Sequence, residues 1–298
     1  MSPPEAASAR SLPGETPARP LVEIRGLSIR FHGRRGPETA VHSLDLSMGR
    51  ERVAIVGESG SGKSVSARAL IGLLPAAAQV TAERLSFDGI DLRNLPEREF
   101  GKLRGRRIAM ILQDPRQSLN PIMTAGQQIV ESCLRHPRVG RRETRRVARD
   151  RAMALLESVS IHEPARVFDL YPHEVSGGMG QRIMIAMMLA AEPDLLIADE
   201  PTSALDMSVR AEVLDEIQKL VEQRGMGLIL ISHDLDLVAR YTDRVVVMYA
   251  GRVMETLESQ HLEQAAHPYT RGLIGCRPLL GHPVRTLPTL VRDEAWKS

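Results

Sequence analysis

Cysteine is scarce in this sequence. The 298 residues include only Cys133 and Cys276, which are not in CxxC spacing. Two such cysteines exclude a disulfide framework and argue against a structural metal site, so a reducing cytoplasm is the expected compartment. With 43% hydrophobic and 26% charged residues, the composition is that of an ordinary globular protein that folds without such cross-links.

Long apolar runs are also missing. The uncharged apolar run at residues 183–191 is much shorter than the roughly 20 residues that a membrane-spanning helix needs, so we expect no span in this chain. Residues 1–20 lack the apolar core of a signal peptide and are rich in Pro, Ala and Ser, which predicts a disordered tail. The net charge of +2 argues against a nucleic-acid-binding protein with a basic surface.

Short runs of Val, Ile and Leu alternate with helical patterns, which predicts an α/β fold with a largely parallel sheet. The predicted strands are residues 53–56, 108–112, 195–198, 228–232 and 245–249, the last continuing into a hairpin through 250–251 to 252–254. Helical spacing replaces the strand pattern between residues 114 and 192, which indicates a helical insertion. Proline-containing pieces after residue 255 indicate an appended extension at 256–298.

The stretch GESGSGKS at residues 57–64 matches the phosphate-loop pattern GxxxxGK[ST] at every position. It lies between a predicted strand and a predicted helix at 65–73, which is the context that the motif requires. The glycines let the backbone wrap phosphates, while the lysine would neutralise β- and γ-phosphate charge and the last serine would ligate Mg²⁺. The candidate nucleotide-binding residues are Gly57, Glu58, Ser59, Gly60, Ser61, Gly62, Lys63 and Ser64.

Polar side chains stand where three further predicted strands finish. Asp199 and Glu200 follow LLIA, His233 follows ILIS, and Gln113 follows IAMIL. In such sheets buried strands end at the nucleotide, so Asp199 is expected to hold the magnesium shell and Glu200 to polarise an attacking water. His233 would contact the γ-phosphate and position the water or Glu200, and the Gln113 amide would reach magnesium or the water. A structural acidic pair and a structural histidine are the alternatives.

A second anion-binding stretch is predicted far from the first. Residues 175–182 read VSGGMGQR and precede an apolar helical run. Free N–H groups at a helix start carry partial positive charge and glycines permit close approach, so this stretch suits a phosphate. A glycine-rich helix cap is the alternative.

Together these motifs resemble those of the ATP-binding-cassette (ABC) ATPases over about residues 21–255. The matching pieces are the phosphate loop, LQDP, VSGGM, LLIADEP, SALD and SHD, in the family's order. The resemblance implies a P-loop NTPase fold of the ABC nucleotide-binding type, with a RecA-like core, an antiparallel β subdomain and a helical subdomain. It also implies MgATP as the ligand and a head-to-tail dimer. Ser176, Gly177 and Gly178 would then hold the partner's γ-phosphate. Phe31 would stack on adenine, with a place in the core as its alternative. Residues 203–206 would line the interface, where Asp206 would also contribute to nucleotide binding.

MILQDPRQSLNP, DEPTSALDMSVRAEVLDEI and HPYTRGL resemble the peptide, dipeptide and nickel importer branch. This implies an ATP-hydrolysing subunit that drives uptake of a dipeptide, oligopeptide, nickel or metal chelate. Such a subunit pairs with a second ATPase subunit, identical or related, and binds two membrane permeases at the cytoplasmic face of a bacterial inner membrane, with a substrate-binding protein outside. Residues 114–121 would contribute to the permease groove. No iron–sulfur cluster is predicted, because Cys276 is the only cysteine in the extension.

Several features depart from this branch or fit another interpretation. Gly180 occupies a place where the branch usually has Arg, and Met179 one where many ABC proteins have Gln. A soluble ABC ATPase acting on DNA or ribosomes is the alternative function. The sequence has no zinc module, no sustained coiled-coil heptads and no second cassette, which such proteins usually carry. A regulatory cassette without turnover is disfavoured because Lys63, Glu200 and His233 are all present. The arginine-rich run at 138–151 is expected to form a solvated face, with lipid or permease contact as its alternative. We expect no nucleic-acid partner.

Overall fold

The computed structural model describes residues 19–33, 36–113, 118–136, 144–203, 205–276 and 293–297. Several predicted features lie wholly or partly outside these ranges: most of the tail at 1–20, the first half of the groove segment 114–121, and most of the C-terminal extension after residue 276. Arg141 and Arg142 of the arginine-rich run and Ala204 of the SALD motif are also outside the described residues.

The central sheet has six strands among the described residues, in the order β11-β10-β3-β9-β8-β7. Five of them are parallel, and β11 pairs with β10 in an antiparallel hairpin. All five predicted strands and the hairpin are therefore confirmed. Their bounds are β3 Arg52–Val56, β7 Ile108–Ile111, β8 Leu195–Asp199, β9 Gly227–Ser232, β10 Arg244–Tyr249 and β11 Arg252–Glu258.

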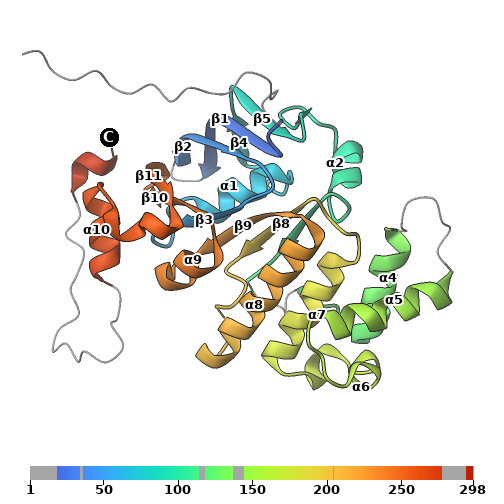
Figure 1. The fold of residues 1–298 in the computed structure, drawn as a ribbon. Coiled ribbons are helices and arrows are strands. Elements are labelled where there is room, and N and C mark those ends of the chain that lie inside the picture. Colours follow the sequence, from blue (N-terminus) through green and yellow to red (C-terminus); the bar gives the residue numbers. More distant parts are fainter. Residues whose placement is uncertain are drawn as a thin grey trace, which may run out of the picture.

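Both faces of this sheet are covered, which explains its continuous apolar runs. Alternate residues of a strand point to opposite faces. Ile197 and Ile229 join a core with α1 (Lys63–Leu70) and the second sheet, whereas Leu196 and Leu228 join a core with α8 (Met207–Arg224). The sheet is thus fixed between two cores, between α1 and α8 in Figure 1. Polar residues that follow β7, β8 and β9 lie together at one edge.

A second, antiparallel sheet packs over α1, in the order β2-β1-β5-β6, with β4 also paired to β1. The resemblance predicted this sheet, but the periodicity of the residues did not place its strands. Long strands β1 (Val22–Gly33) and β2 (Gly36–Met48) alternate buried apolar and exposed polar residues, as expected for a sheet with one wet face. The shorter members are β4 Ala78–Thr81, β5 Arg84–Phe87 and β6 Ile90–Asp91, followed by α2 Glu97–Leu103.

Within the described residues between β7 and β8, four helices form a separate lobe in Figure 1. Their apolar faces meet around buried side chains such as Ile129, Cys133 and Leu156. Hydroxyl side chains begin three of them: Thr124 makes a capping box with Gln127, and Thr144 and Ser176 each accept a backbone N–H. The helices are α4 Ala125–Arg135, α5 Arg145–Ser158, α6 Pro164–Phe168 and α7 Gly177–Leu189, with a short 3₁₀ turn η1 at Pro172–Glu174.

The chain ends against the central sheet. The 3₁₀ helix η2 (Ser259–Gln264), α10 (Pro268–Gly275) and η3 (Glu294–Lys297) follow β11, and α9 (Leu235–Tyr241) lies beside them. Their apolar side chains share a third core with Ala54 and Val56 of β3. Across the described ranges, every helix is too short or too polar to span a membrane.

Candidate functional site

The phosphate loop connects β3 to α1 through a backbone path that requires glycine. Gly57, Gly60 and Gly62 have φ values of 147°, 81° and 96°, which residues with a Cβ rarely adopt. A Cβ on Gly57 would lie 2.0 Å from the Met248 carbonyl oxygen, and one on Gly62 would lie 2.6 Å from that of Ala40. The loop is therefore pressed against β10 on one side and β2 on the other, with its shape fixed by the sequence GESGSGKS.

We expect Gly57→Ala to damage this loop selectively. A left-handed φ at a non-glycine residue costs about 1–3 kcal/mol, and the contact with the carbonyl oxygen of Met248 adds to it, so ATP affinity should fall at least about tenfold. Equilibrium dialysis with labelled ATP measures this. Gly49→Ala is the matched control, because its added Cβ meets nothing within 4 Å. Equal ATP affinity in the two variants would contradict the assigned loop geometry.

Lys63 lies inside the loop. Its Nζ donates to the carbonyl oxygens of Gly57 at 2.9 Å and Glu58 at 2.7 Å, and the side chain is buried. Burial lowers the pKa of Lys63, and the carboxylates of Glu200 and Asp199 act in the opposite direction. A buried cation held by backbone carbonyls beside a helix N-terminus is well placed to receive phosphate oxygens.

Ser64 and Asp199 bring two oxygen ligands together. The Ser64 Oγ donates to Asp199 Oδ1 at 2.6 Å, and Arg68 Nη2 stands 3.8 Å from Asp199 Oδ2. Burial raises the pKa of Asp199, an effect opposed by the Ser64 hydrogen bond. A hydroxyl and one carboxylate fit Mg²⁺, which is usually held by one or two protein oxygens together with substrate phosphates and water. Ser64 and Asp199 are therefore chemically suited to bind Mg²⁺, as the sequence predicted.

Glu200 receives contacts from both neighbouring strand ends. Gln113 Nε2 donates to its Oε2 at 3.1 Å, and His233 Nδ1 lies 3.4 Å from its Oε1. Glu200 itself has φ 47°, a strained value for a non-glycine residue, and its N–H donates to the Ile231 carbonyl at 2.9 Å. Strain of this kind persists where surrounding structure holds it, and here it directs a carboxylate out of β8 between β7 and β9.

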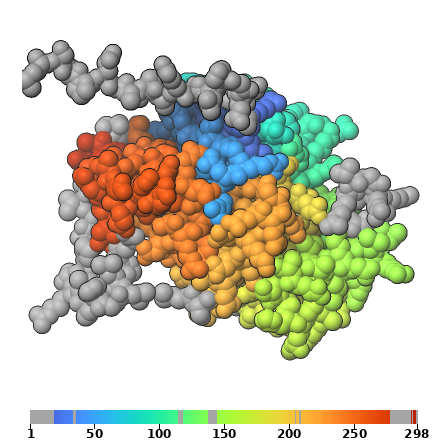
Figure 2. Space-filling model, in the orientation of Figure 1, coloured from blue at the N-terminus to red at the C-terminus, as the bar shows by residue number. Residues whose placement is uncertain are grey.

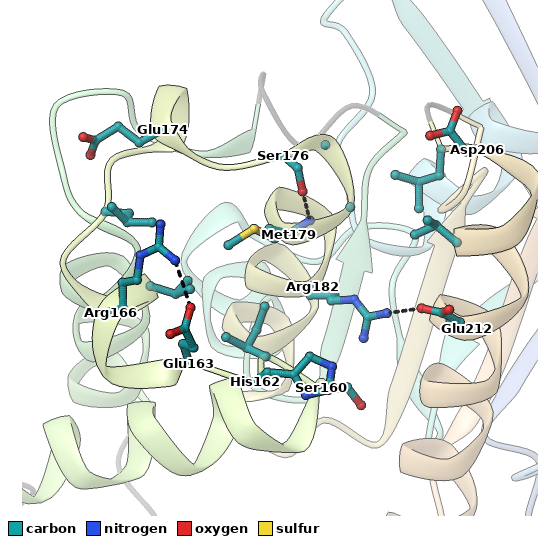
Figure 3. Close-up of a pocket in the computed structure, with 17 residues that line it drawn as sticks. Ser160, His162, Glu163, Arg166, Glu174, Ser176, Met179, Arg182, Asp206 and Glu212 are labelled. Atoms are coloured by element: carbon teal, nitrogen blue, oxygen red, sulfur yellow. Dashed lines mark hydrogen bonds and ion pairs between the residues drawn. The ribbon is translucent and has the colours of Figure 1, made fainter.

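The glycine-rich stretch at 175–182 forms the start of α7. Ser176 Oγ accepts the Met179 N–H at 3.3 Å, while Ser176 and Gly177 are exposed at the helix N-terminus. This end opens into a cavity of about 670 Å³ (Figure 3), which Gly178 and Asp206 also line. None of residues 57–64 lines that cavity. The second predicted anion site is thus separate from the first within this chain.

An arginine joins α7 to α8. Arg182 is largely buried and pairs with Glu212 of α8 at 2.9 Å (Figure 3). It also pairs with Glu216 of the same helix. Its Nη1 also donates to the Val159 carbonyl at 3.0 Å. The position of the α7 N-terminus is therefore coupled to α8. The sequence reasoning did not assign Arg182, because its partners lie 30 and 34 residues further along the chain.

Phe31 is partly buried on β1, where its pairing partners are Glu38 on β2 and Ala78 on β4. β2 is the strand whose Ala40 carbonyl borders the phosphate loop at Gly62. Phe31 is thus on a strand next to the one that touches the loop. Its stacking on adenine remains a prediction.

A contact missed from the sequence joins the loop to the far end of the chain. The backbone N–H of Glu58 donates to the Tyr269 hydroxyl at 3.2 Å. Tyr269 is in HPYTRGL, which in the sequence served only as a marker of resemblance. Nothing in local spacing indicates a contact over 211 positions.

Comparison with known proteins gives one consistent family. The ABC transporter family model matches residues 41–203. The dipeptide transport ATP-binding protein DppD of Escherichia coli (strain K12) is 44% identical over 92% of this chain and 80% of its own length. The oligopeptide transport ATP-binding protein OppD of Mycobacterium tuberculosis is 44% identical over 88% of this chain and 42% of its length.

Solved structures agree with the fold. The ATP-binding cassette MJ0796, in a dimeric post-hydrolysis state bound to ADP and Pi, superposes with a TM-score of 0.70 at 25% identity, covering 80% of this chain and 99% of that one. CbiO1 from Clostridium perfringens, part of the CbiONQ transporter complex, gives a TM-score of 0.69 at 25% identity over 83% of this chain and 91% of that one.

Proposed function

Because the chain belongs to the ABC transporter family and to its peptide-importer branch, we propose that it is the ATP-hydrolysing subunit that drives uptake of dipeptides, oligopeptides or a related small solute. The observation that carries this proposal is the convergence of the strand ends of β7, β8 and β9 on one carboxylate beside a complete phosphate loop. The similarity to dipeptide and oligopeptide transport ATP-binding proteins supports the solute class.

The residues divide into a binding set and a hydrolytic set. Lys63 would bind β- and γ-phosphate oxygens, and Ser64 and Asp199 would hold Mg²⁺, which supplies charge neutralisation on those oxygens. Glu200 would accept a proton as water attacks the γ-phosphorus and the bond to ADP breaks. Gln113 and His233 would orient Glu200 and the water, in keeping with their contacts of 3.1 and 3.4 Å to its two oxygens.

The active unit is proposed to be a head-to-tail dimer. The N-terminus of α7, with Ser176, Gly177 and Gly178, opens into a cavity that contains no phosphate-loop residue of its own chain, so a phosphate there would come from a partner. Asp206 lines the same cavity. Nucleotide would then join the subunits, and loss of the γ-phosphate would release them. The partner is a second copy or a related ATPase subunit.

Two membrane permeases are the proposed partners at the helical lobe. Ile122, just after the groove segment 114–121, is 80% exposed, and Leu112 is 38% exposed on the other side of that segment. A cavity of about 380 Å³ lies nearby, lined by Thr124 and by Arg145, Arg146 and Arg149 of α5. Exposed apolar side chains next to a hollow suit an amphipathic helix from a permease. Docking there would place the chain at the cytoplasmic face of a bacterial inner membrane, with a substrate-binding protein outside.

Ile122→Asp is expected to weaken permease binding at least about tenfold, because it places a charge in an apolar contact. The test is co-purification with co-expressed permeases of a peptide importer. Val80→Asp is the control: Val80 is 39% exposed but lies on β4 in the other lobe. ATP affinity of the isolated chain should stay unchanged in both variants. Undiminished permease recovery with Ile122→Asp would remove this groove from the proposal.

The absence of an iron–sulfur cluster stays a prediction. Cys276, partly exposed, remains the only cysteine of the C-terminal extension. Iron and sulfide analysis of protein purified without oxygen tests it, with no stoichiometric cluster as the expected result.

A further inference from the structure

The C-terminal extension contacts the phosphate loop directly. In Figure 2 the orange C-terminal surface lies directly beside the blue surface around α1. The contact at its centre is the hydrogen bond from the Glu58 N–H to the Tyr269 hydroxyl, at 3.2 Å. Glu58 is the second residue of the loop, and Tyr269 is in the first turn of α10.

One peptide group of the loop is held at both ends. The carbonyl oxygen of Gly57 accepts from Lys63 Nζ at 2.9 Å, and the N–H of the same peptide unit donates to Tyr269. Since a peptide group is planar, fixing the direction of its N–H fixes the direction of its carbonyl. Gly57 has no Cβ to restrict rotation of this peptide. The Tyr269 hydroxyl therefore fixes the orientation of the Gly57–Glu58 peptide group, which the backbone of Gly57 leaves free to rotate.

The hydroxyl is itself rigidly placed. The Tyr269 side chain is 0% exposed, and its ring centroid lies 4.7 Å from that of Tyr249 and 5.7 Å from that of Trp296. It shares a core with Ala54 and Val56 of β3, the strand that leads into the loop. A tyrosine packed in this way loses little further entropy when it bonds the loop.

The start of α10 is fixed by its own hydrogen bonds. Glu255 on β11 accepts the N–H groups of Ala266 at 2.8 Å and His267 at 3.2 Å. His267 Nδ1 in turn accepts the N–H of Tyr269 at 3.1 Å. The extension is therefore tied to the hairpin of the central sheet immediately before the residue that contacts the loop.

We propose that Tyr269 is a positioning residue for ATP: it orients the first peptide of the phosphate loop, and with it the carbonyl that holds Lys63, so that the loop is preorganised for the phosphates. This inference rests on the proposed ATPase function. Because Tyr269 bonds the loop, whereas Glu200 is held by Gln113 and His233, Tyr269 should affect nucleotide binding and leave the hydrolytic step unchanged.

The test compares Tyr269→Phe with Tyr249→Phe in the full chain. Both variants remove one hydroxyl from the same aromatic cluster, but only Tyr269 bonds the loop. Equilibrium dialysis with labelled ATP gives Kd, and steady-state hydrolysis gives KM and kcat. Loss of one neutral hydrogen bond predicts that Tyr269→Phe raises Kd and KM about three- to tenfold with kcat within about twofold. Tyr249→Phe should leave all three close to wild type.

Two outcomes would overturn the inference: unchanged Kd and KM in Tyr269→Phe, or an equal rise in both variants, which would indicate a general packing effect. Thermal unfolding of both variants without nucleotide measures their stability. If Tyr269 had only a structural role, Tyr269→Phe would lower stability and leave the Kd for ATP unchanged. Failure of the proposed function is distinguishable, because wild-type protein would then neither bind nor hydrolyse ATP.

Discussion

Glu200→Gln is expected to lower ATP turnover by about 10²- to 10⁴-fold, the usual contribution of a general base, while ATP still binds. The amide keeps the shape of the carboxylate but cannot take a proton from water. Gln113 Nε2 and His233 Nδ1 lie 3.1 and 3.4 Å from the two oxygens of Glu200, so one side of the replacement still accepts the amide hydrogen bond. Binding depends on the loop, Ser64 and Asp199, which this change leaves in place.

Because the γ-phosphate is then retained, the variant should also accumulate as an ATP-dependent dimer. Phosphate release measures turnover, and size-exclusion chromatography with and without MgATP measures dimerisation. Glu99→Gln on α2 is the control, because that carboxylate is partly exposed and pairs with Lys102 at 2.6 Å. Wild-type turnover in Glu200→Gln would remove Glu200 from its assigned role.

Lys63→Ala is expected to weaken ATP binding by about 10- to 150-fold, the range for losing a charged hydrogen bond. The Lys63 Nζ donates to the carbonyl oxygens of Gly57 and Glu58, so this positive charge lies inside the loop. Hydrolysis should fall further, since negative charge at the γ-phosphate would be left without this cation in the transition state.

Lys63→Arg separates charge from geometry. A guanidinium keeps the charge but is planar and larger than an ammonium, and the space within the loop is limited by contacts such as that of Gly57 with Met248. We therefore expect Lys63→Arg to restore little of the affinity. Exposed Lys102, 58% accessible on α2, provides the control as Lys102→Ala. Wild-type ATP affinity in Lys63→Ala would exclude the phosphate-loop assignment.

Local sequence was sufficient to predict which polar side chains meet at the edge of the sheet; their roles in binding and hydrolysis stay predictions. The phosphate loop is continuous, and Gln113, Asp199, Glu200 and His233 each follow a short apolar run, so parallel pairing places them at one edge of the sheet. In the structure, Gln113 and His233 both contact the carboxylate of Glu200, as this argument predicts. The same logic predicted all five parallel strands, because a strand buried on both faces reads as an apolar run.

The features that local sequence did not predict depend on distant pairing. β1 alternates charged with apolar residues and pairs with β4 and β5 across 47 to 65 residues, so its role was visible only through the resemblance. Arg182 meets Glu212 on another helix, and Tyr269 reaches Glu58 across 211 positions. Periodicity describes which face of an element is apolar but does not determine which distant element will cover it.

The central claim is that this chain couples ATP hydrolysis to import. The most direct measurement is the ATPase rate of the chain assembled with its permeases and ATPase partner in proteoliposomes, with and without a peptide-loaded binding protein. The account predicts stimulation by the loaded binding protein and none with Glu200→Gln. Hydrolysis that ignores the binding protein but rises with DNA or ribosomes would contradict the import function.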